Sequence, residues 1–257
     1  MLKFKTVNIT FFILLILLVV FDQRAPLPFF TFVILISIYL IILVYGSAVL
    51  SIQFFLPVTW RGEVRSNAVA LTFDDGPIPG NTEKILEILK LYKIQAAFFC
   101  IGNRIADHPD LAKRIHEDGH LLGNHSYWHR VTFDLQTARK IEQELIDTDD
   151  VIQRSVGIKP NFFRPPFGVS NPMVAKAVKK RGYRTIGWSV RSMDTLGKNS
   201  SIVLDRVTKS VKGGDIILLH DYSSVTLEVL PALLDHVLKV GLKIVRLDIL
   251  LNEKPYG

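Results

Sequence analysis

Two long hydrophobic runs occupy the start of the chain. Val7 to Phe21 is apolar apart from Asn8 and Thr10, and Phe29 to Leu56 contains no charged residue. A helix needs about 20 apolar residues to cross a bilayer, so the second run is long enough and the first is marginal. No small-x-small cleavage site follows the first run. The pattern predicts a retained membrane anchor over residues 1–59, formed by a transmembrane helical hairpin with segments at about 7–21 and 29–56.

After residue 60, short apolar runs alternate with amphipathic stretches. The apolar runs predict strands near residues 68–73, 96–101, 121–124, 161–164, 184–188, 215–219 and 243–246. Apolar residues at helical spacing predict helices near 83–92, 109–119, 135–153, 172–181, 202–211 and 227–240, the first capped by Asn81-Thr82. This alternation predicts an α/β fold with a mostly parallel sheet and helices outside it.

Charge and cysteine content limit the possible binding partners and disulfides. The formal net charge is +7, which suits an anionic cell envelope or lipid head groups. The basic residues are dispersed, without a basic run or a known nucleic-acid motif, so the chain is not predicted to bind nucleic acid. The single cysteine, Cys100, lies in an apolar run and is interpreted as a core residue that forms no internal disulfide.

Two adjacent carboxylates, Asp74 and Asp75, follow the first predicted strand of the domain and precede the turn Gly76-Pro77. Side chains of adjacent strand residues point to opposite faces, but a bend at a strand end can bring both toward one pocket. One carboxylate could then hold a metal ion while the other takes a proton. An Asp-Asp-Gly turn is also ordinary loop chemistry.

Two histidines, His125 and His129, are four residues apart in His-Ser-Tyr-Trp-His. If this segment is helical, both imidazoles lie on one face and can reach one metal ion. The alternative is a surface helix with two unrelated histidines. His120 precedes an apolar pair and is interpreted as a structural residue.

Two further strand ends carry polar side chains. Arg164 begins the proline-stiffened segment Arg-Pro-Pro-Phe-Gly, and His220 ends the apolar run that starts at Asp215. Site residues of α/β barrels lie at the carboxyl ends of strands. Each motif alone also fits a solvated arginine or a structural histidine, but their order along the chain favours one shared site.

The four motifs resemble those of the polysaccharide deacetylases, carbohydrate esterases built on the NodB homology domain. Thr-Phe-Asp-Asp-Gly, His-Ser-x-x-His, Arg-x-Pro-Phe-Gly and Leu-x-His follow the family's order, and the resemblance covers roughly residues 61–250. It implies a distorted (β/α) barrel of about seven strands, fewer than in the complete barrel, in a catalytic domain at residues 60–257. It also implies a metal-dependent hydrolase that removes N-acetyl or O-acetyl groups from a cell-envelope polysaccharide or amino-sugar oligomer.

The resemblance further implies roles for individual residues. Asp75, His125 and His129 would bind one divalent metal ion, zinc in the first place, with cobalt, nickel or manganese as alternatives. The other roles are a general base, an arginine that orients and ionises it, a substrate-binding loop with a backbone N–H for the oxyanion, a general acid and a contact for the acyl methyl group. Asp74 would be the general base and Arg164 the arginine, Pro166 and Phe167 would form the substrate-binding loop, and His220 would be the general acid. Leu218 would contact the acyl methyl group.

One motif departs from the family pattern. The usual Asp-x-x-Asp-Trp is here Arg191-Ser192-Met193-Asp194-Thr195. Asp194 keeps the second carboxylate and is expected to pair with His220. Because Thr195 replaces a tryptophan of the substrate groove, groove shape and substrate size stay open. Arg191 either contacts an anionic substrate group or faces solvent.

Two arguments about membrane topology, one from charge and one from the substrate, disagree. Lys3, Lys5, Arg61 and Arg65 flank the hairpin on one side, so the positive-inside rule weakly favours a cytoplasmic domain. A polysaccharide substrate favours the outside, and we predict an integral membrane protein with an extracytoplasmic domain that folds alone from about Trp60. The expected partners are an N-acetylated glycan and the lipid bilayer, and no protein partner is indicated. The rival functions are deformylation of a lipid-linked amino sugar and non-catalytic glycan binding.

Overall fold

A parallel sheet forms the centre of the domain. The computed structural model describes residues 3–196 and 199–257. The strand order is β5-β4-β3-β2-β1-β7-β6, and β8 pairs beside the start of β1. The strands are β1 (Ala68–Gly76), β2 (Ala97–Cys100), β3 (Leu121–Asn124), β4 (Phe162–Phe163), β5 (Arg184–Thr185), β6 (Val190–Arg191), β7 (Ile216–His220) and β8 (Lys243–Ile244).

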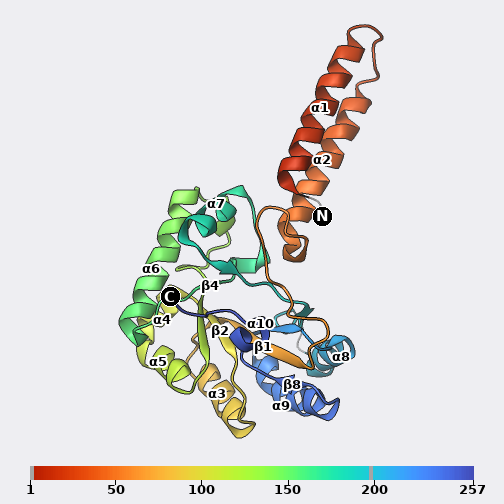
Figure 1. Cartoon of the computed structure of the whole chain (residues 1–257). Helices are drawn as coiled ribbons and strands as arrows, with labels where there is room; N and C mark the ends of the chain where they lie inside the picture. Colours follow the sequence, from red (N-terminus) through yellow and green to blue (C-terminus); the bar gives the residue numbers. More distant parts are fainter. Residues whose placement is uncertain (1–2, 197–198) are drawn as a thin grey trace.

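Helices cover the outside of the sheet, while a hairpin of two helices extends away from it (Figure 1). The α-helices are α1 (Phe4–Asp22), α2 (Phe30–Ala48), α3 (Asn81–Leu91), α4 (Gly102–Asp107), α5 (Pro109–Glu117), α6 (Ala138–Val156), α7 (Pro172–Arg181), α8 (Ser200–Ser210), α9 (Ser224–Lys239) and α10 (Leu247–Leu251). Short 3₁₀ turns lie at Leu50–Ile52, Phe133–Leu135 and Pro166–Gly168.

The predicted α/β fold with about seven strands is confirmed. All residues of β1 are buried, as expected for an apolar central strand with parallel neighbours on both sides. The short strand β6 was not predicted, because two residues give no detectable alternation. Cys100 and His120 are buried, and the His120 Nδ1 atom accepts a hydrogen bond from Ala96 N.

The helix α3 begins two residues earlier than predicted. Asn81 is its first residue, and the predicted cap residue Thr82 directs its hydroxyl to the buried carboxylate of Asp221 instead. This contact ties the start of α3 to the end of β7, next to the carboxyl end of the sheet.

The hairpin helices α1 and α2 each have 19 residues and a mean hydropathy of 2.4, which by length and composition is enough to cross a membrane. Their side chains are exposed or half-buried, and Gly46 is the one buried residue in the two helices. The polar interruption at Asn8 is satisfied within the pair, since its side-chain oxygen accepts a hydrogen bond of 2.5 Å from the Tyr39 hydroxyl.

The second apolar run is divided between hairpin and domain. The helix α2 ends at Ala48, whereas Leu50, Leu56 and Val58 are buried in a domain core cluster with Phe163 and Val174. Just beyond, the Thr59 N–H donates to the Thr185 carbonyl, beside β5. The helical span is therefore shorter than the predicted 29–56 segment, and the core of the domain extends back to about residue 50.

Candidate active site

A cavity of about 430 Å³ lies at the carboxyl ends of the strands. The central strand β1 brings Asp74 and Asp75, the loop after β3 brings His125 and His129, and β7 brings His220. The cavity is lined by Asp74, Asp75, Ile101, Arg104, His125, His129, Phe167, Gly168, Trp188, Arg191, Thr195, Leu196, Leu218, His220 and Tyr222.

A bulge in β1 explains how two adjacent carboxylates share the cavity. Asp74 pairs with Phe99 and Gly76 with Cys100, which leaves Asp75 as the extra residue with a φ of 72°. The extra residue of a bulge bends the strand and redirects a side chain. The alternation of the strand is broken there, and both carboxylates face the same pocket.

Asp75, His125 and His129 bring three potential metal-ligand atoms within 4.8 Å of one another. The Oδ1 atom of Asp75 lies 3.4 Å from His125 Nε2 and 3.2 Å from His129 Nε2. That oxygen is buried and has no hydrogen-bond partner among the described residues. An unpaired buried carboxylate oxygen between two imidazole nitrogens fits a divalent cation.

The pKa values of Asp75 and His129 are also consistent with metal binding. Burial and the neighbouring charge of His125 lower the pKa of His129 to about 4. Burial opposes ionisation of Asp75, but the adjacent imidazoles of His125 and His129 lower its pKa well below the usual range. The His125 Nδ1–H lies 2.7 Å from the Arg164 carbonyl, an arrangement that leaves Nε2 as the ligand atom. Metal ligands must be deprotonated, and the lowered pKa values of Asp75 and His129 meet that requirement.

The segment with the two histidines is a loop, so the helical arrangement considered for it from the sequence does not occur. Ser126 and His129 have positive φ angles of 64° and 49°, which no α-helix contains. The buried carboxylate of Glu144, on α6, holds the turn by accepting hydrogen bonds from the Tyr127 and Trp128 N–H groups. The two imidazoles meet because the turn folds back, not because they share a helix face.

Arg164 lies directly behind Asp74 and is completely buried. Its Nη1 atom is 2.7 Å from Asp74 Oδ1 and 2.8 Å from the Thr72 hydroxyl, and its Nη2 atom donates to the Gly187 carbonyl. Burial lowers the pKa of Arg164, but the charge of Asp74 opposes this effect. The guanidinium therefore fixes one carboxylate oxygen of Asp74 and leaves the other near the histidines.

His220 and Asp194 form the pair expected from the sequence. The Nδ1 atom of His220 lies 2.8 Å from Asp194 Oδ1, and the His220 N–H donates to Oδ2. Burial lowers the pKa of His220, but the hydrogen bond and charge of Asp194 raise it to a net value above the ordinary one. Asp194 also accepts from the hydroxyls of Ser192 and Thr226, two residues that sequence reasoning missed.

Two of the three predicted substrate-binding residues line the cavity. Leu218 is buried in its wall, and the half-exposed Phe167 ring lies 4.6 Å from the His129 ring. Pro166 is buried and is not among the residues that line the cavity. Phe167 has a φ of 58°, so the turn after Arg164 is sharply bent.

The motifs of the sequence assign no role to the lining residues Arg104 and Trp188, and they leave the roles of Arg191 and Thr195 open. Arg104, on α4, donates to the Asp75 carbonyl and so holds the bulge in place. Arg191 is exposed and lies over the Trp188 ring, with its Cζ atom 5.6 Å from the centroid. Trp188 and Thr195 form part of the wall for which the family pattern uses the tryptophan of its Asp-Trp pair.

Comparison with known proteins gives a consistent result. The model of the family described as polysaccharide deacetylase matches residues 61–186. A peptidoglycan-N-acetylglucosamine deacetylase of Bacillus cereus (strain ATCC 14579) is 35% identical over 202 residues, which are 77% of this chain and 94% of that protein. The peptidoglycan-N-acetylmuramic acid deacetylase PdaA of Bacillus subtilis (strain 168) is 34% identical over 199 residues, 76% of this chain and 75% of that protein.

Solved structures share the fold. A crystal structure of a peptidoglycan N-acetylglucosamine deacetylase bound to a benzohydroxamate has a TM-score of 0.74 at 27% identity, covering 78% of this chain and 95% of that one. A pseudoenzyme of the CE4 family from Bacillus anthracis has a TM-score of 0.70 at 29% identity, covering 77% and 70%. Because the fold also includes a pseudoenzyme, catalysis must be argued from the site residues.

Proposed function

Because the chain belongs to the polysaccharide deacetylase family, we propose that it hydrolyses N-acetyl groups on the amino sugars of a cell-wall glycan. The observation that carries this proposal is one cavity that holds a metal-ligand triad, a carboxylate fixed by an arginine and a histidine paired with a carboxylate. The names of the relatives make peptidoglycan the first substrate to test.

The triad Asp75, His125 and His129 is proposed to hold a divalent metal ion, zinc being the first choice because two imidazoles and a carboxylate suit it. When bound, such an ion would lower the pKa of water and polarise the acyl oxygen. Asp75 is ionised and His129 is neutral at pH 7, so neither of these two ligands would need to release a proton to bind the ion.

Asp74 is proposed to be the general base. Arg164 holds its Oδ1, while its Oδ2 lies 3.8 Å from His125 Nε2 and faces the triad. A carboxylate in that position can accept the proton of the attacking water. Arg164 makes its contacts with Thr72, Asp74 and the Gly187 carbonyl from a fully buried position, so the base is held in one orientation.

His220 is proposed to be the general acid. Asp194 fixes the ring through Nδ1, and Nε2 remains to donate a proton to the departing amine. The raised pKa of His220 favours the protonated form that this role requires. The backbone N–H of Phe167 would help bind the oxyanion, and Leu218 would contact the acetyl methyl group.

The two apolar helices are proposed to anchor the enzyme domain in the membrane, with the domain on the extracytoplasmic side where a wall glycan lies. Their length, hydropathy and exposed side chains support this proposal. The domain is proposed to start nearer residue 49 than residue 60, and the burial of Leu50 and Leu56 in its core supports this boundary.

The test is the full chain in neutral detergent, assayed on N-acetylated peptidoglycan fragments for release of acetate. We expect turnover that stops after treatment with a chelator and returns on addition of zinc. Release of formate from an N-formylated, lipid-linked amino sugar, without release of acetate from the fragments, would identify the rival deformylase. Binding of the fragments without turnover, in a metal-loaded protein, would identify a glycan-binding protein and refute the proposal.

A further inference from the structure

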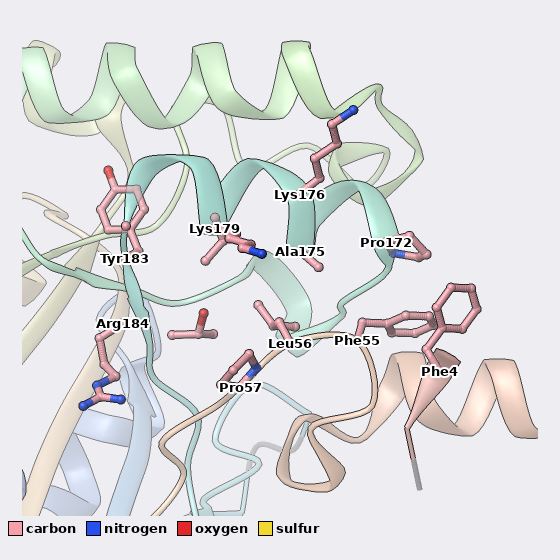
Figure 2. A pocket seen from close by; sticks show the side chains of 13 residues that line it. Phe4, Phe55, Leu56, Pro57, Pro172, Ala175, Lys176, Lys179, Tyr183 and Arg184 are labelled. Carbon is pink, nitrogen blue, oxygen red and sulfur yellow. The ribbon is translucent and has the colours of Figure 1, made fainter. Parts of the chain in front are cut away.

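A second cavity lies where the hairpin meets the domain. Its volume is about 740 Å³. Helix α7 forms one side, and the segment Phe55–Pro57 together with Phe4, at the start of α1, forms the facing side (Figure 2). It is separate from the active site, since the two cavities share no lining residue.

The hairpin side of this cavity is apolar. Phe4 and Phe55 are half-buried, with ring centroids 5.0 Å apart, and Leu56 and Pro57 continue the same wall. The Phe4 N–H donates to the Phe54 carbonyl, which folds the beginning of α1 back onto the segment after α2. These residues therefore lie at the end of both apolar helices, at the depth where acyl chains meet lipid head groups if the hairpin spans the bilayer.

The opposite side carries unpaired positive charge. Lys176 and Lys179, both exposed, line the cavity from α7. Figure 2 shows Lys179 lying along α7 near Ala175, whereas the Lys176 side chain projects from the same helix away from Leu56 and Phe55, so its flexible stem must turn for its amine to reach the cavity. No aspartate or glutamate is among the lining residues that the structure describes.

The pairing of the neighbouring basic residues makes these two lysines stand out. Nearby Lys180, Arg181 and Arg184 have carboxylate partners in Glu142, Asp149 and Glu253. Lys176 and Lys179 form no ion pair with any residue in the described part of the chain. Among the five basic residues between 176 and 184, the two without a carboxylate partner are the two lysines that line the cavity from α7.

We propose that this cavity binds the head group of an anionic phospholipid of the same membrane, with the phosphate at Lys176 and Lys179 and the first acyl carbons against Phe4, Phe55 and Leu56. The unpaired lysines match the phosphate of such a lipid, and the adjacent apolar wall matches its acyl chains. The inference rests on the proposed membrane anchor, but not on the proposed catalytic chemistry.

The experiment is a lipid titration of the full chain in neutral detergent, followed by native mass spectrometry. Dioleoyl phosphatidylglycerol is the anionic probe, and dioleoyl phosphatidylcholine has the same acyl chains without net charge. We expect phosphatidylglycerol to bind roughly tenfold more tightly or better. The K176Q/K179Q variant should weaken that binding by a factor on the order of 10–30, since each lysine near a membrane surface is worth about 1 kcal/mol.

The matched control is K239Q/K243Q, which removes the same charge from exposed lysines at α9 and β8, neither of which lines the cavity. Its binding should stay within about twofold of the unchanged protein. Equal affinity for the two lipids, or unchanged binding in K176Q/K179Q, would overturn the lipid site. Glycerol 3-phosphate binding as tightly as phosphatidylglycerol would overturn the role of the apolar wall and indicate an anionic polymer or free phosphate.

Failure of the anchor is separated from failure of the site by alkaline extraction of membranes. A chain extracted into the supernatant would overturn both the anchor and the lipid site. An embedded chain that does not discriminate between the lipids would overturn only the lipid site. The acetate assay reports independently on the proposed deacetylase activity.

Discussion

A protein of residues 60–257 should be far less stable than a protein of residues 49–257. The sequence suggests a domain start near Trp60, but the core includes Leu50, Leu56 and Val58, which are 6%, 6% and 5% exposed. The N–H of Thr59 donates to the Thr185 carbonyl, and the Gly187 N–H donates to the Thr59 carbonyl. Truncation at residue 60 removes these side chains and both hydrogen bonds.

The expected loss is large compared with the stability of a domain. Burying a Leu or Val side chain contributes about 1.5–3 kcal/mol, so the three contribute about 5–9 kcal/mol. Domains are stable by only about 5–15 kcal/mol. For a domain of this size, such a loss corresponds to a Tm lowered by about 10–35 °C. We expect the 60–257 protein to be unfolded or aggregated near room temperature, and the 49–257 protein to fold.

Circular dichroism melting and urea unfolding of the two proteins measure this difference. The control is the 49–257 protein with Leu50→Ala, Leu56→Ala and Val58→Ala, because it keeps the chain length and removes the packing. It should reproduce most of the loss. If the 60–257 protein melts within a few degrees of the longer one, the argument from core packing is wrong.

Three further predictions concern the site. Asp74→Asn should lower the rate of acetate release by a factor on the order of 10²–10⁴ while the protein keeps its normal metal content. Asp75→Asn should instead lower the metal content. Equal metal loss in the two variants would contradict these roles. In Asp194→Asn the alkaline limb of the pH–rate profile should move to lower pH, because Asp194 raises the pKa of His220. The His220–Asp194 pair contributes its full stability below about pH 6.5, and this contribution is lost as the pH rises through the raised pKa of His220 in the folded protein. Asp194→Asn should therefore lower the free energy of unfolding, measured by urea titration, more at pH 6 than at pH 9. Equal losses at the two pH values would refute the pairing. Glu144→Gln should weaken zinc binding about tenfold in chelator competition, because Glu144 holds the loop that carries His125 and His129. The control Glu142→Gln, on the same helix, should leave zinc binding unchanged. Equal effects of the two variants would count against this role of Glu144.

Much of the sheet could be predicted from the sequence, since buried parallel strands are short apolar runs. The predicted strands near 68–73, 121–124 and 215–219 correspond to β1, β3 and β7. The sequence could not show that the run from Phe29 to Leu56 divides at Ala48. Membrane-facing and core-facing residues are equally apolar, and only the contacts of Leu50 and Leu56 with the domain distinguish them.

The site could be predicted to the extent that short motifs carry it. The family resemblance is confirmed by the comparisons, and the three proposed metal ligands lie together. Arg104 and Glu144 were missed because each acts on the site from a helix remote in sequence, through a carbonyl or an N–H group. Such contacts depend on how helices pack and leave no spacing signal in the chain.

The junction between hairpin and domain links the proposed anchor to the proposed chemistry. The Ser47 hydroxyl, in the last turn of α2, donates to the Ser170 carbonyl at 2.6 Å, and the Ser170 N–H donates back to the Ser47 carbonyl. Ser170 follows Phe167 by three residues, which span at most about 11 Å. With the hairpin in a bilayer, the wall of the catalytic cavity lies one short loop from the membrane-facing end of the domain. If both proposals hold, the glycan that would reach Asp74 and His220 is the part of the cell wall nearest the membrane, the same surface whose lipids the second cavity would bind.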